Sequence, residues 1–288
     1  MRKSISILFL LFVALMTAQE VKHLTLEDAV LGRSKGLYPE QKAFQWIEGS
    51  DDFISVENEF VYVNINIDKR PVLFSLEELQ KAIPDLKRMP FPFSIITSES
   101  VYFDHNNSIL KFNYVDKKVF DKIKYPNEAE NTDFNAEANA VTYTIENNLY
   151  VANSSDSKLA ITNSEDKNIV SGQAIARSEF GIRKGTFWSP KGNYLAFYQK
   201  DESNVTIYPL VDVTTTPATL NSIKYPMNGM DSELAKVWIY SMHNNSVVYL
   251  DIDTSDEHYL TNLSWSPDEK FVFLAEINRD QDHMWFSM

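Results

Sequence analysis

The chain has 288 residues, of which 44% are hydrophobic, 13% aromatic and 23% charged, a composition typical of globular proteins. Its net charge of −13 argues against nucleic acid as a partner, because binding to phosphates requires Lys and Arg side chains. The sequence has no cysteine, which excludes disulfides and thiolate nucleophiles. Its five histidines include no His-x-x-x-His pair that would indicate a metal site. We therefore expect neither a metal nor a cofactor.

The first 18 residues have the pattern of a secretory signal peptide. Arg2 and Lys3 form a short basic region, residues 5–16 form an apolar run that is too short to span a bilayer, and Thr17 and Ala18 are a small-residue exit. We expect cleavage after residues 1–18, no membrane span in the mature chain, and a periplasmic or secreted location. An uncleaved anchor is the alternative.

Two short helices are predicted. Thr25 can cap a helix that carries Asp28 in its first turn, where a negative charge is favourable, and Gly32 ends that helix. A second helix is expected over residues 75–82, ended by Pro84.

The rest of the chain alternates apolar and polar residues with a period of two, which predicts β-strands. The 18 Phe and 14 Tyr residues, against only 8 Gly, also favour β structure. A strand series of this density indicates a sandwich, a barrel or a propeller. The expected strands are residues 60–67, 101–103, 109–114, 141–145, 149–152, 194–199, 238–242, 249–252 and 271–277.

An internal repeat favours the propeller. Residues 187–190 read Phe-Trp-Ser-Pro and residues 264–267 read Ser-Trp-Ser-Pro, each followed by a polar turn and an alternating strand. Residues 133–136 begin a third copy, and a weaker one starts at Gln45. Propeller blades repeat roughly every 40–50 residues, so the longer intervals here require insertions. We interpret Trp188 and Trp265 as core residues and not as ligand platforms, because buried aromatic rings dominate blade packing.

The segment over residues 176–190, Ala-Arg-Ser-Glu-Phe-Gly-Ile-Arg-Lys-Gly-Thr-Phe-Trp-Ser-Pro, is the most informative of the chain. Together with the Thr-Leu-Glu-Asp opening at Thr25, it resembles the propeller of the dipeptidyl peptidase IV branch of the prolyl oligopeptidase family. The resemblance implies an all-β fold for residues 19–288: an incomplete β-propeller of roughly five to six blades from an eight-bladed ring, with a short helix at its amino-terminal end.

The resemblance also implies a binding residue. Glu179 stands where the family's glutamate grips the free amino terminus of a peptide, and Arg177 of the Arg-Ser-Glu-Phe motif is a second candidate. A fixed carboxylate is a natural acceptor for an ammonium group, and at the end of a cleft it also limits peptide length. Mammalian relatives have a second glutamate where this chain has Ser178. The alternative is that Glu179 is a surface acid paired with Arg177 or Arg183.

No catalytic residue is predicted in this chain. A serine hydrolase of this family requires a Gly-x-Ser-x-Gly elbow, and the sequence contains none. We expect the propeller portion of an exported serine exopeptidase that releases N-terminal dipeptides or tripeptides after proline or alanine. Its partners would be peptide amino termini, a C-terminal hydrolase domain that is missing or separate, and, for the full-length protein, a second copy in a homodimer. The alternative is a stand-alone periplasmic propeller that binds a protein or glycan.

Two further segments are given no chemistry. Residues 200–203 read as a solvated acidic loop. Residues 208–210 and 225–227 each contain a proline and are expected at an edge or in an arm of the fold, because proline is confined to such places in sheets.

The signal peptide gives a first prediction. Amino-terminal sequencing of the exported protein should begin at or near Gln19, because cleavage follows the small residues Thr17 and Ala18. Exported protein that retains Met1 would contradict it.

Overall fold

The computed structural model describes residues 23–38, 43–64, 71–154, 158–252 and 257–288. The chain divides into two compact units, Met1–Ala43 and Phe44–Met288. The predicted signal peptide, residues 1–18, lies outside the described residues, as does Gln19. None of the helices within the described ranges is long and apolar enough to cross a membrane.

The first unit contains the predicted amino-terminal helix, α2 (Leu26–Leu31). Thr25 caps it: the Thr25 hydroxyl accepts the Asp28 N–H at 3.1 Å, and the Asp28 carboxylate accepts the Thr25 N–H at 3.1 Å. This reciprocal pair satisfies two N–H groups that a helix otherwise leaves without partners. Gly32 is the C-cap, as the sequence predicts.

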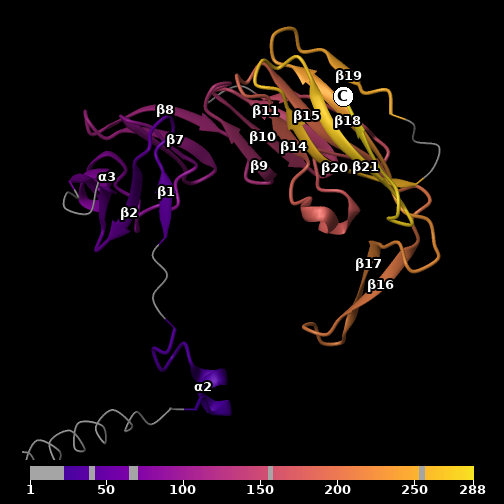
Figure 1. The fold of residues 1–288 in the computed structure, drawn as a ribbon, viewed down its shortest axis with the longest axis horizontal. Coiled ribbons are helices and arrows are strands. Elements are labelled where there is room, and N and C mark those ends of the chain that lie inside the picture. Colours follow the sequence, from indigo (N-terminus) through magenta and orange to yellow (C-terminus); the bar gives the residue numbers. More distant parts are fainter. Residues whose placement is uncertain (1–22, 39–42, 65–70, 155–157, 253–256) are drawn as a thin grey trace, which may run out of the picture. The chain divides into compact units, whose positions relative to one another are not determined.

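The second unit is built from antiparallel sheets, which confirms the all-β fold (Figure 1). Within its described residues there are five sheets of three to five strands and one separate two-stranded hairpin. The first three sheets consist of β1 (Phe44–Trp46), β2 (Phe53–Glu57), β3 (Phe60–Asn64) and β4 (Val72–Ser75); β5 (Ile95–Ile96), β6 (Ser100–Asp104), β7 (Ser108–Asn113) and β8 (Lys118–Lys124); and β9 (Glu130–Asn135), β10 (Ala140–Ile145), β11 (Asn148–Ala152) and β12 (Leu159–Ala160).

The fourth and fifth sheets complete the series, and the number of sheets agrees with the predicted five to six blades. The fourth sheet contains β13 (Ile169–Ser171), β14 (Thr186–Trp188), β15 (Tyr194–Asp201), β18 (Leu234–Ser241) and β19 (Val247–Tyr249), and the fifth contains β20 (His258–Trp265), β21 (Val272–Asn278) and β22 (Met284–Ser287).

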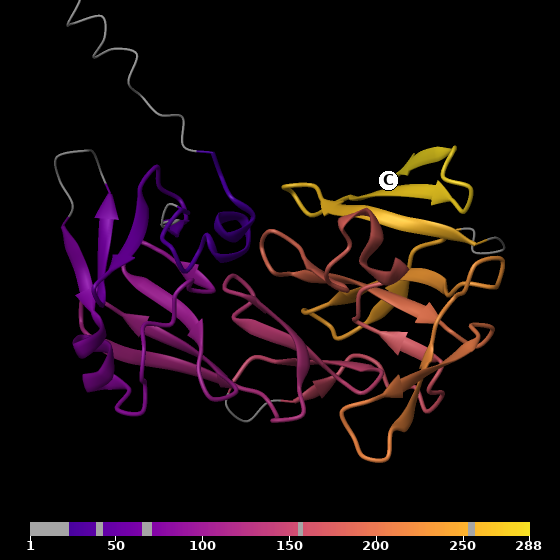
Figure 2. The same ribbon diagram turned by 90° about the horizontal axis from the view of Figure 1, so that it is seen from below.

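Sheets that are neighbours in the chain pack face to face. The order of the sheets can be followed in Figure 2 by the colours from indigo to yellow. Each of four hydrophobic cores is shared by two successive sheets, so that every inner sheet contributes to two cores. Each core is represented here by two buried residues, one from each of its two sheets. In chain order these pairs are Phe74 and Phe103, Ile123 and Tyr143, Leu149 and Phe197, and Tyr198 and Leu260.

Strand β15 shows how the period-two pattern serves two cores. Leu195 and Phe197 belong to the core shared with the third sheet, whereas Ala196 and Tyr198 belong to the core shared with the fifth. Successive side chains of a strand point to opposite faces, so a strand between two sheets must be apolar on both. All four residues are at most 1% exposed.

The repeated tryptophans join successive sheets. The Trp265 indole donates to the Phe187 carbonyl at 3.0 Å, and the Trp188 indole donates to the Asp133 carbonyl at 3.2 Å. Each acceptor directly precedes the aromatic residue at the equivalent position of the preceding copy of the repeat. Both tryptophans are half-buried and pack against the hydrophobic cores, which confirms a packing role but places them at the margin of the cores, and the indole N–H also accounts for the choice of Trp.

The turn after each tryptophan also contacts the preceding sheet. The Glu269 carboxylate, only 8% exposed, accepts the Lys191 N–H at 2.6 Å and the Asn193 amide at 2.7 Å. At the equivalent position one copy earlier, Gly192 lies so close to the turn at Ala138 that an added Cβ would come within 2.4 Å of the Ala138 nitrogen. These contacts hold the third, fourth and fifth sheets together at their turns.

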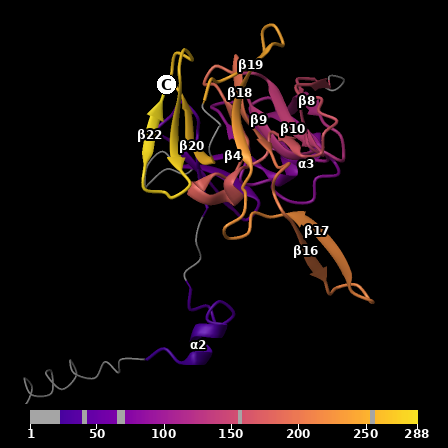
Figure 3. The same cartoon turned by 90° about the vertical axis from the view of Figure 1, so that its right-hand side faces the viewer.

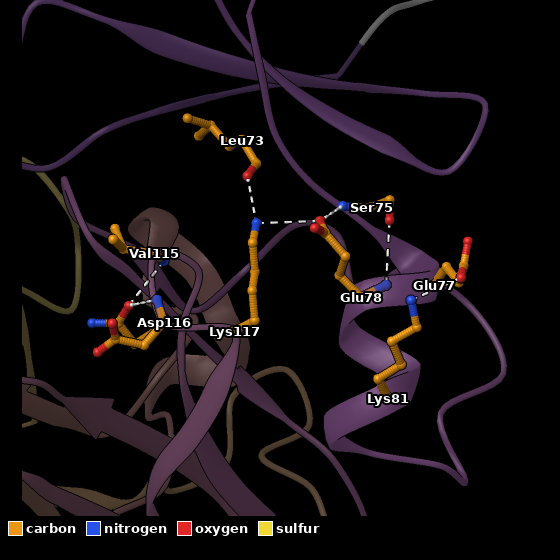
Figure 4. A network of polar contacts seen from close by, with 9 residues as sticks. Leu73, Ser75, Glu77, Glu78, Lys81, Val115, Asp116 and Lys117 are labelled. Carbon is orange, nitrogen blue, oxygen red and sulfur yellow. Dashed lines mark hydrogen bonds and ion pairs between the residues drawn. The ribbon is translucent and has the colours of Figure 1, made fainter.

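The second predicted helix is α3 (Leu76–Ala82), capped by Ser75 (Figure 4). The Ser75 hydroxyl accepts the Glu78 N–H at 3.3 Å, and Glu78 accepts the Ser75 N–H at 2.9 Å. Lys117, in the turn between β7 and β8, donates to Glu78 at 3.2 Å and to the Leu73 carbonyl at 3.0 Å. One lysine thus ties the cap of α3 to the second sheet.

The hairpin of β16 (Ile207–Asp212) and β17 (Thr219–Lys224) lies between β15 and β18 in the chain and projects from the sheets (Figure 3). Both strands are exposed along most of their length. Pro209 lies inside β16 and Pro226 lies two residues beyond the end of β17, which confirms the expectation of an arm for these segments.

Glu269 supplies a test of the contacts between sheets. Burial raises its pKa, but hydrogen bonds from Ser189, Asn193 and Lys191 outweigh burial and hold the pKa below its ordinary value. A lowered pKa in the folded state stabilises the fold above the unfolded pKa, and this stabilisation is lost as the pH falls through the folded pKa. Glu269→Gln should therefore reduce the free energy of unfolding by about 1.5–3 kcal/mol at pH 7, and this difference should shrink steadily as the pH falls below about 4.3, the ordinary pKa of a Glu side chain.

The measurement is urea denaturation of both proteins between pH 3 and pH 7. Glu165→Gln is the control, since Glu165 is exposed and its side chain has no partner among the described residues. A loss of stability for Glu269→Gln that is the same at every pH would contradict the role of its charge.

Candidate functional site

The segment that contains Glu179 is an insertion within one edge strand of the fourth sheet. β13 and β14 pair with the same edge of β15, and the chain leaves the sheet between them. Both ends of the insertion bond to one residue: the Gly172 N–H donates to the Tyr198 carbonyl at 2.8 Å, and the Tyr198 N–H donates to the Gly185 carbonyl at 2.9 Å. We call residues 173–184 the Glu179 loop.

Two glycines allow this narrow base. An added Cβ at Gly185 would come within 2.3 Å of the Gln173 backbone, and one at Gly172, where φ is +75°, would come within 2.7 Å of the Leu149 side chain. Between them, the Tyr198 side chain is 1% exposed and its hydroxyl donates to the Leu260 carbonyl at 2.9 Å, while burial raises its pKa. The loop is therefore anchored on a strand fixed between two cores.

The backbone of the Glu179 loop is strained where the loop turns. Ala176, Arg177, Ser178 and Phe180 have φ values of 52°, 51°, 65° and 52°, in the left-handed region that residues other than glycine rarely adopt. Such a conformation costs about 1–2 kcal/mol per residue. The segment Ala176–Gly181 is accordingly not a regular helix, because its backbone angles are non-helical from Arg177 to Phe180. Local strain of this kind clusters at functional sites.

Glu179 itself is extended, with φ −64° and ψ 166°, between the left-handed residues Ser178 and Phe180. Its side chain is exposed. Across the described parts of the chain, the Glu179 carboxylate has neither a hydrogen bond nor an ion pair, and only its backbone carbonyl accepts, from the Ile182 N–H at 3.0 Å. The carboxylate is thus presented without a partner of its own.

Arg177 does not pair with Glu179. Its guanidinium donates to the carbonyl of Lys224, the last residue of β17, and lies 4.7 Å from the ring centre of Tyr225. Arg183 forms no ion pair with a described residue either. The pairing required by the alternative interpretation of Glu179 as a surface acid is therefore not present. No sequence pattern predicts the contact between Arg177 and Lys224, because the two residues are 47 positions apart in the chain.

Two other residues support the loop from the fourth and fifth sheets. Glu233, only 8% exposed, accepts the Ala176 N–H at 2.7 Å. The Phe180 ring packs on Tyr259 of β20, with 4.8 Å between ring centres. Neither residue was singled out from the sequence. In Figures 1 and 3, the segment Ala176–Gly181 and the base of the β16–β17 hairpin lie at the same end of the sheets.

The interpretation of residues 200–203 as a solvated loop is wrong in part. Lys200 and Glu202 form an ion pair of 2.8 Å, and their side chains are only 15% and 17% exposed. Both are held at the end of β15, where the Glu202 carbonyl also accepts from Lys224 at 3.0 Å. Glu202 is therefore a structural residue and not a neutral surface position.

The described residues contain no group of three His, Asp or Glu side chains that could hold a metal ion. The chemistry available at the Glu179 loop is instead that of one exposed anion on a braced backbone. Such a group can accept several hydrogen bonds from a cation.

Comparisons with known proteins agree with this architecture. The family model described as the dipeptidyl peptidase IV (DPP IV) N-terminal region matches residues 97–288. Dipeptidyl aminopeptidase B of Saccharomyces cerevisiae is 27% identical over 196 residues, which are 64% of this chain and 23% of the yeast protein. The chain thus spans about a quarter of that relative.

Two solved structures are similar. A protein described as a dipeptidyl aminopeptidase IV, from Bacteroides ovatus, has a TM-score of 0.72 and 36% identity, over 85% of this chain and 36% of its own. Dipeptidyl peptidase 4 of Porphyromonas gingivalis has a TM-score of 0.66 and 16% identity, over 92% of this chain and 40% of its own, and shows the fold alone.

The narrow base of the Glu179 loop gives a prediction. Gly185→Ala should destabilise the fold by about 3 kcal/mol, because its Cβ would collide with the Gln173 backbone. Gly181→Ala, where φ is +75° but no atom lies within 4 Å of the added Cβ, should cost only about 1 kcal/mol from backbone strain. Urea denaturation measures both, and equal losses would show that the base of the loop is not closely packed.

Proposed function

Because the chain belongs to the family of the dipeptidyl peptidase IV N-terminal region, we propose that it is the propeller portion of an exported serine exopeptidase that releases N-terminal dipeptides or tripeptides. Its part in the reaction is to admit the peptide and to anchor the peptide's amino terminus on Glu179. Proteolysis itself is assigned to a hydrolase domain that this sequence does not contain. Export rests on the signal-peptide pattern of residues 1–18.

The observation that carries the proposal is the unpartnered carboxylate of Glu179 on a strained and braced loop. A peptide amino terminus is an ammonium group with three donors, and a carboxylate accepts from it in charge-assisted hydrogen bonds. The carboxylate meets no cation within the described chain, so binding an ammonium group requires no existing ion pair to be broken. The rigid strands beneath the loop keep the acceptor in place before the peptide arrives.

A fixed acceptor also explains release of short fragments. If the amino terminus is held at Glu179 and the reacting serine is at a fixed distance, only the peptide bond at that distance can be cleaved. Acetylation of the amino terminus removes the positive charge and blocks the position of the ammonium group. Acetylated peptides should therefore be poor substrates.

The experiment measures kcat/KM of the longer peptidase that carries this chain, with free-amino and acetylated peptides. Glu179→Gln should lower kcat/KM for the free-amino peptide by roughly tenfold to a hundredfold, since a charged hydrogen bond contributes about 1.5–3 kcal/mol. The acetylated peptide should be affected little, because it does not use the carboxylate.

Glu165→Gln is the matched control, because it makes the same change at an exposed carboxylate outside the Glu179 loop. Thermal unfolding of both variants should match that of the wild type. If Glu179→Gln leaves turnover of the free-amino peptide unchanged, Glu179 does not anchor the substrate. A stand-alone propeller that binds a protein or glycan would then be the better account.

A further inference from the structure

The base of the β16–β17 hairpin is in direct contact with the Glu179 loop. Arg177 lies two residues before Glu179 and is the contact residue. Its guanidinium donates to the Lys224 carbonyl and covers the ring of Tyr225 at 4.7 Å. A hydrogen bond and a cation–π contact thus act on one side chain from two consecutive residues of the hairpin base.

The hairpin base is itself firmly held. The Lys224 ammonium donates to the carbonyls of Glu202 and Val205, at 3.0 Å each, and the Tyr225 N–H donates to the Thr206 carbonyl at 2.9 Å. These bonds join both ends of the hairpin to the chain that leaves β15. The hairpin beyond its base pairs with no other sheet among the described residues. The hairpin base is therefore a fixed support for Arg177. The strands beyond the base do not contribute to this support.

The strain in the loop makes such a support necessary. Three consecutive residues, Ala176 to Ser178, are left-handed without being glycine, and such a turn relaxes unless its surroundings hold it. Glu233 holds the first of them through the Ala176 N–H, and Tyr259 packs on Phe180 beyond Glu179. Between these two contacts, Arg177 provides the support nearest to Glu179 on its amino-terminal side.

We propose that the hairpin base is a specificity element of the amino-terminus site, in which Tyr225 and the Lys224 carbonyl hold Arg177 and thereby set the direction of Glu179. In this account Arg177 is a positioning residue and does not bind the peptide. The inference rests on the proposed function of Glu179. It differs from the expectation that Arg177 contacts substrate, because its guanidinium is already engaged by the hairpin.

The test compares Arg177→Met and Tyr225→Leu in the longer peptidase that carries this chain. The readout is the ratio of kcat/KM for a free-amino peptide to that for its acetylated form. Each variant should lower this ratio by roughly threefold to tenfold, mainly through KM, and leave the acetylated peptide unaffected. The double variant should lose no more than Arg177→Met alone, because that change already removes the contact between Arg177 and Tyr225. Tyr225→Phe keeps an aromatic face for the guanidinium and should retain the wild-type ratio.

The matched control is Val213→Ser, in the hairpin turn, at a residue 79% exposed, which should leave the ratio unchanged. If Arg177 itself binds the peptide, Arg177→Met should lower turnover of both peptides and Tyr225→Leu should have no effect. That result would overturn the inference. Additive losses in the double variant would overturn it too.

Failure of the inference can be told from failure of the proposed function. If Glu179→Gln lowers the ratio and Tyr225→Leu does not, only the inference fails; if neither variant changes it, the proposed function fails as well. Hydrogen exchange is a second readout that does not depend on turnover. Tyr225→Leu should speed exchange of the Ser178 and Ile182 amides, whose bonds to the Ile175 and Glu179 carbonyls close the turn. Unchanged exchange at both amides would contradict the role of the hairpin base.

Discussion

The constraint on which the structure depends is that each inner sheet must bury both of its faces. Strand β15 meets it by sending Leu195 and Phe197 to one core and Ala196 and Tyr198 to the next. Full burial of a large apolar side chain stabilises the fold by about 1.5–3 kcal/mol, so a strand with two such faces is held firmly in place. The hydrogen bonds of Trp188, Trp265 and Glu269 each join a sheet to the sheet that precedes it in the chain. A sheet placed in this way is a rigid support for whatever leaves its edge.

The Glu179 loop uses that support. It leaves and rejoins the sheet opposite Tyr198, whose side chain is locked between the fourth and fifth sheets. The left-handed turn above it is unfavourable by itself, and the hydrogen bond from the Ala176 N–H to Glu233 helps to maintain it. The result is an extended Glu179 whose carboxylate points to no partner in the described chain. The stability of the sheets is thus linked to the strain at the site.

The sequence predicted those features that short patterns determine. The capping box at Thr25 and Asp28, the helix after Ser75 and the repeated aromatic turns follow from spacing within a few residues. Glu179 was singled out from a motif, and the structure adds that it lies in a loop inserted into a strand. Its role in binding stays a prediction.

Other features depend on the tertiary fold. Nothing in Ala-Arg-Ser-Glu-Phe indicates left-handed backbone, because glycine is the usual signal and here it occurs only at Gly181. The contacts of Arg177 with Lys224 and of Ala176 with Glu233 join residues far apart in the chain, so no local pattern could reveal them. The ion pair of Lys200 and Glu202 was missed because an acidic turn at the end of a strand resembles a solvated loop.

In the proposed function, the Glu179 carboxylate receives the amino terminus of a peptide. The measurement is a crystal structure of the proposed peptidase, with its propeller and hydrolase domain together, and with a bound, uncleaved free-amino peptide. The account predicts that the peptide ammonium nitrogen lies about 2.7–2.9 Å from a carboxylate oxygen of Glu179, the distance of a charge-assisted hydrogen bond. A bound peptide whose amino terminus lies elsewhere, with Glu179 still facing solvent, would contradict it.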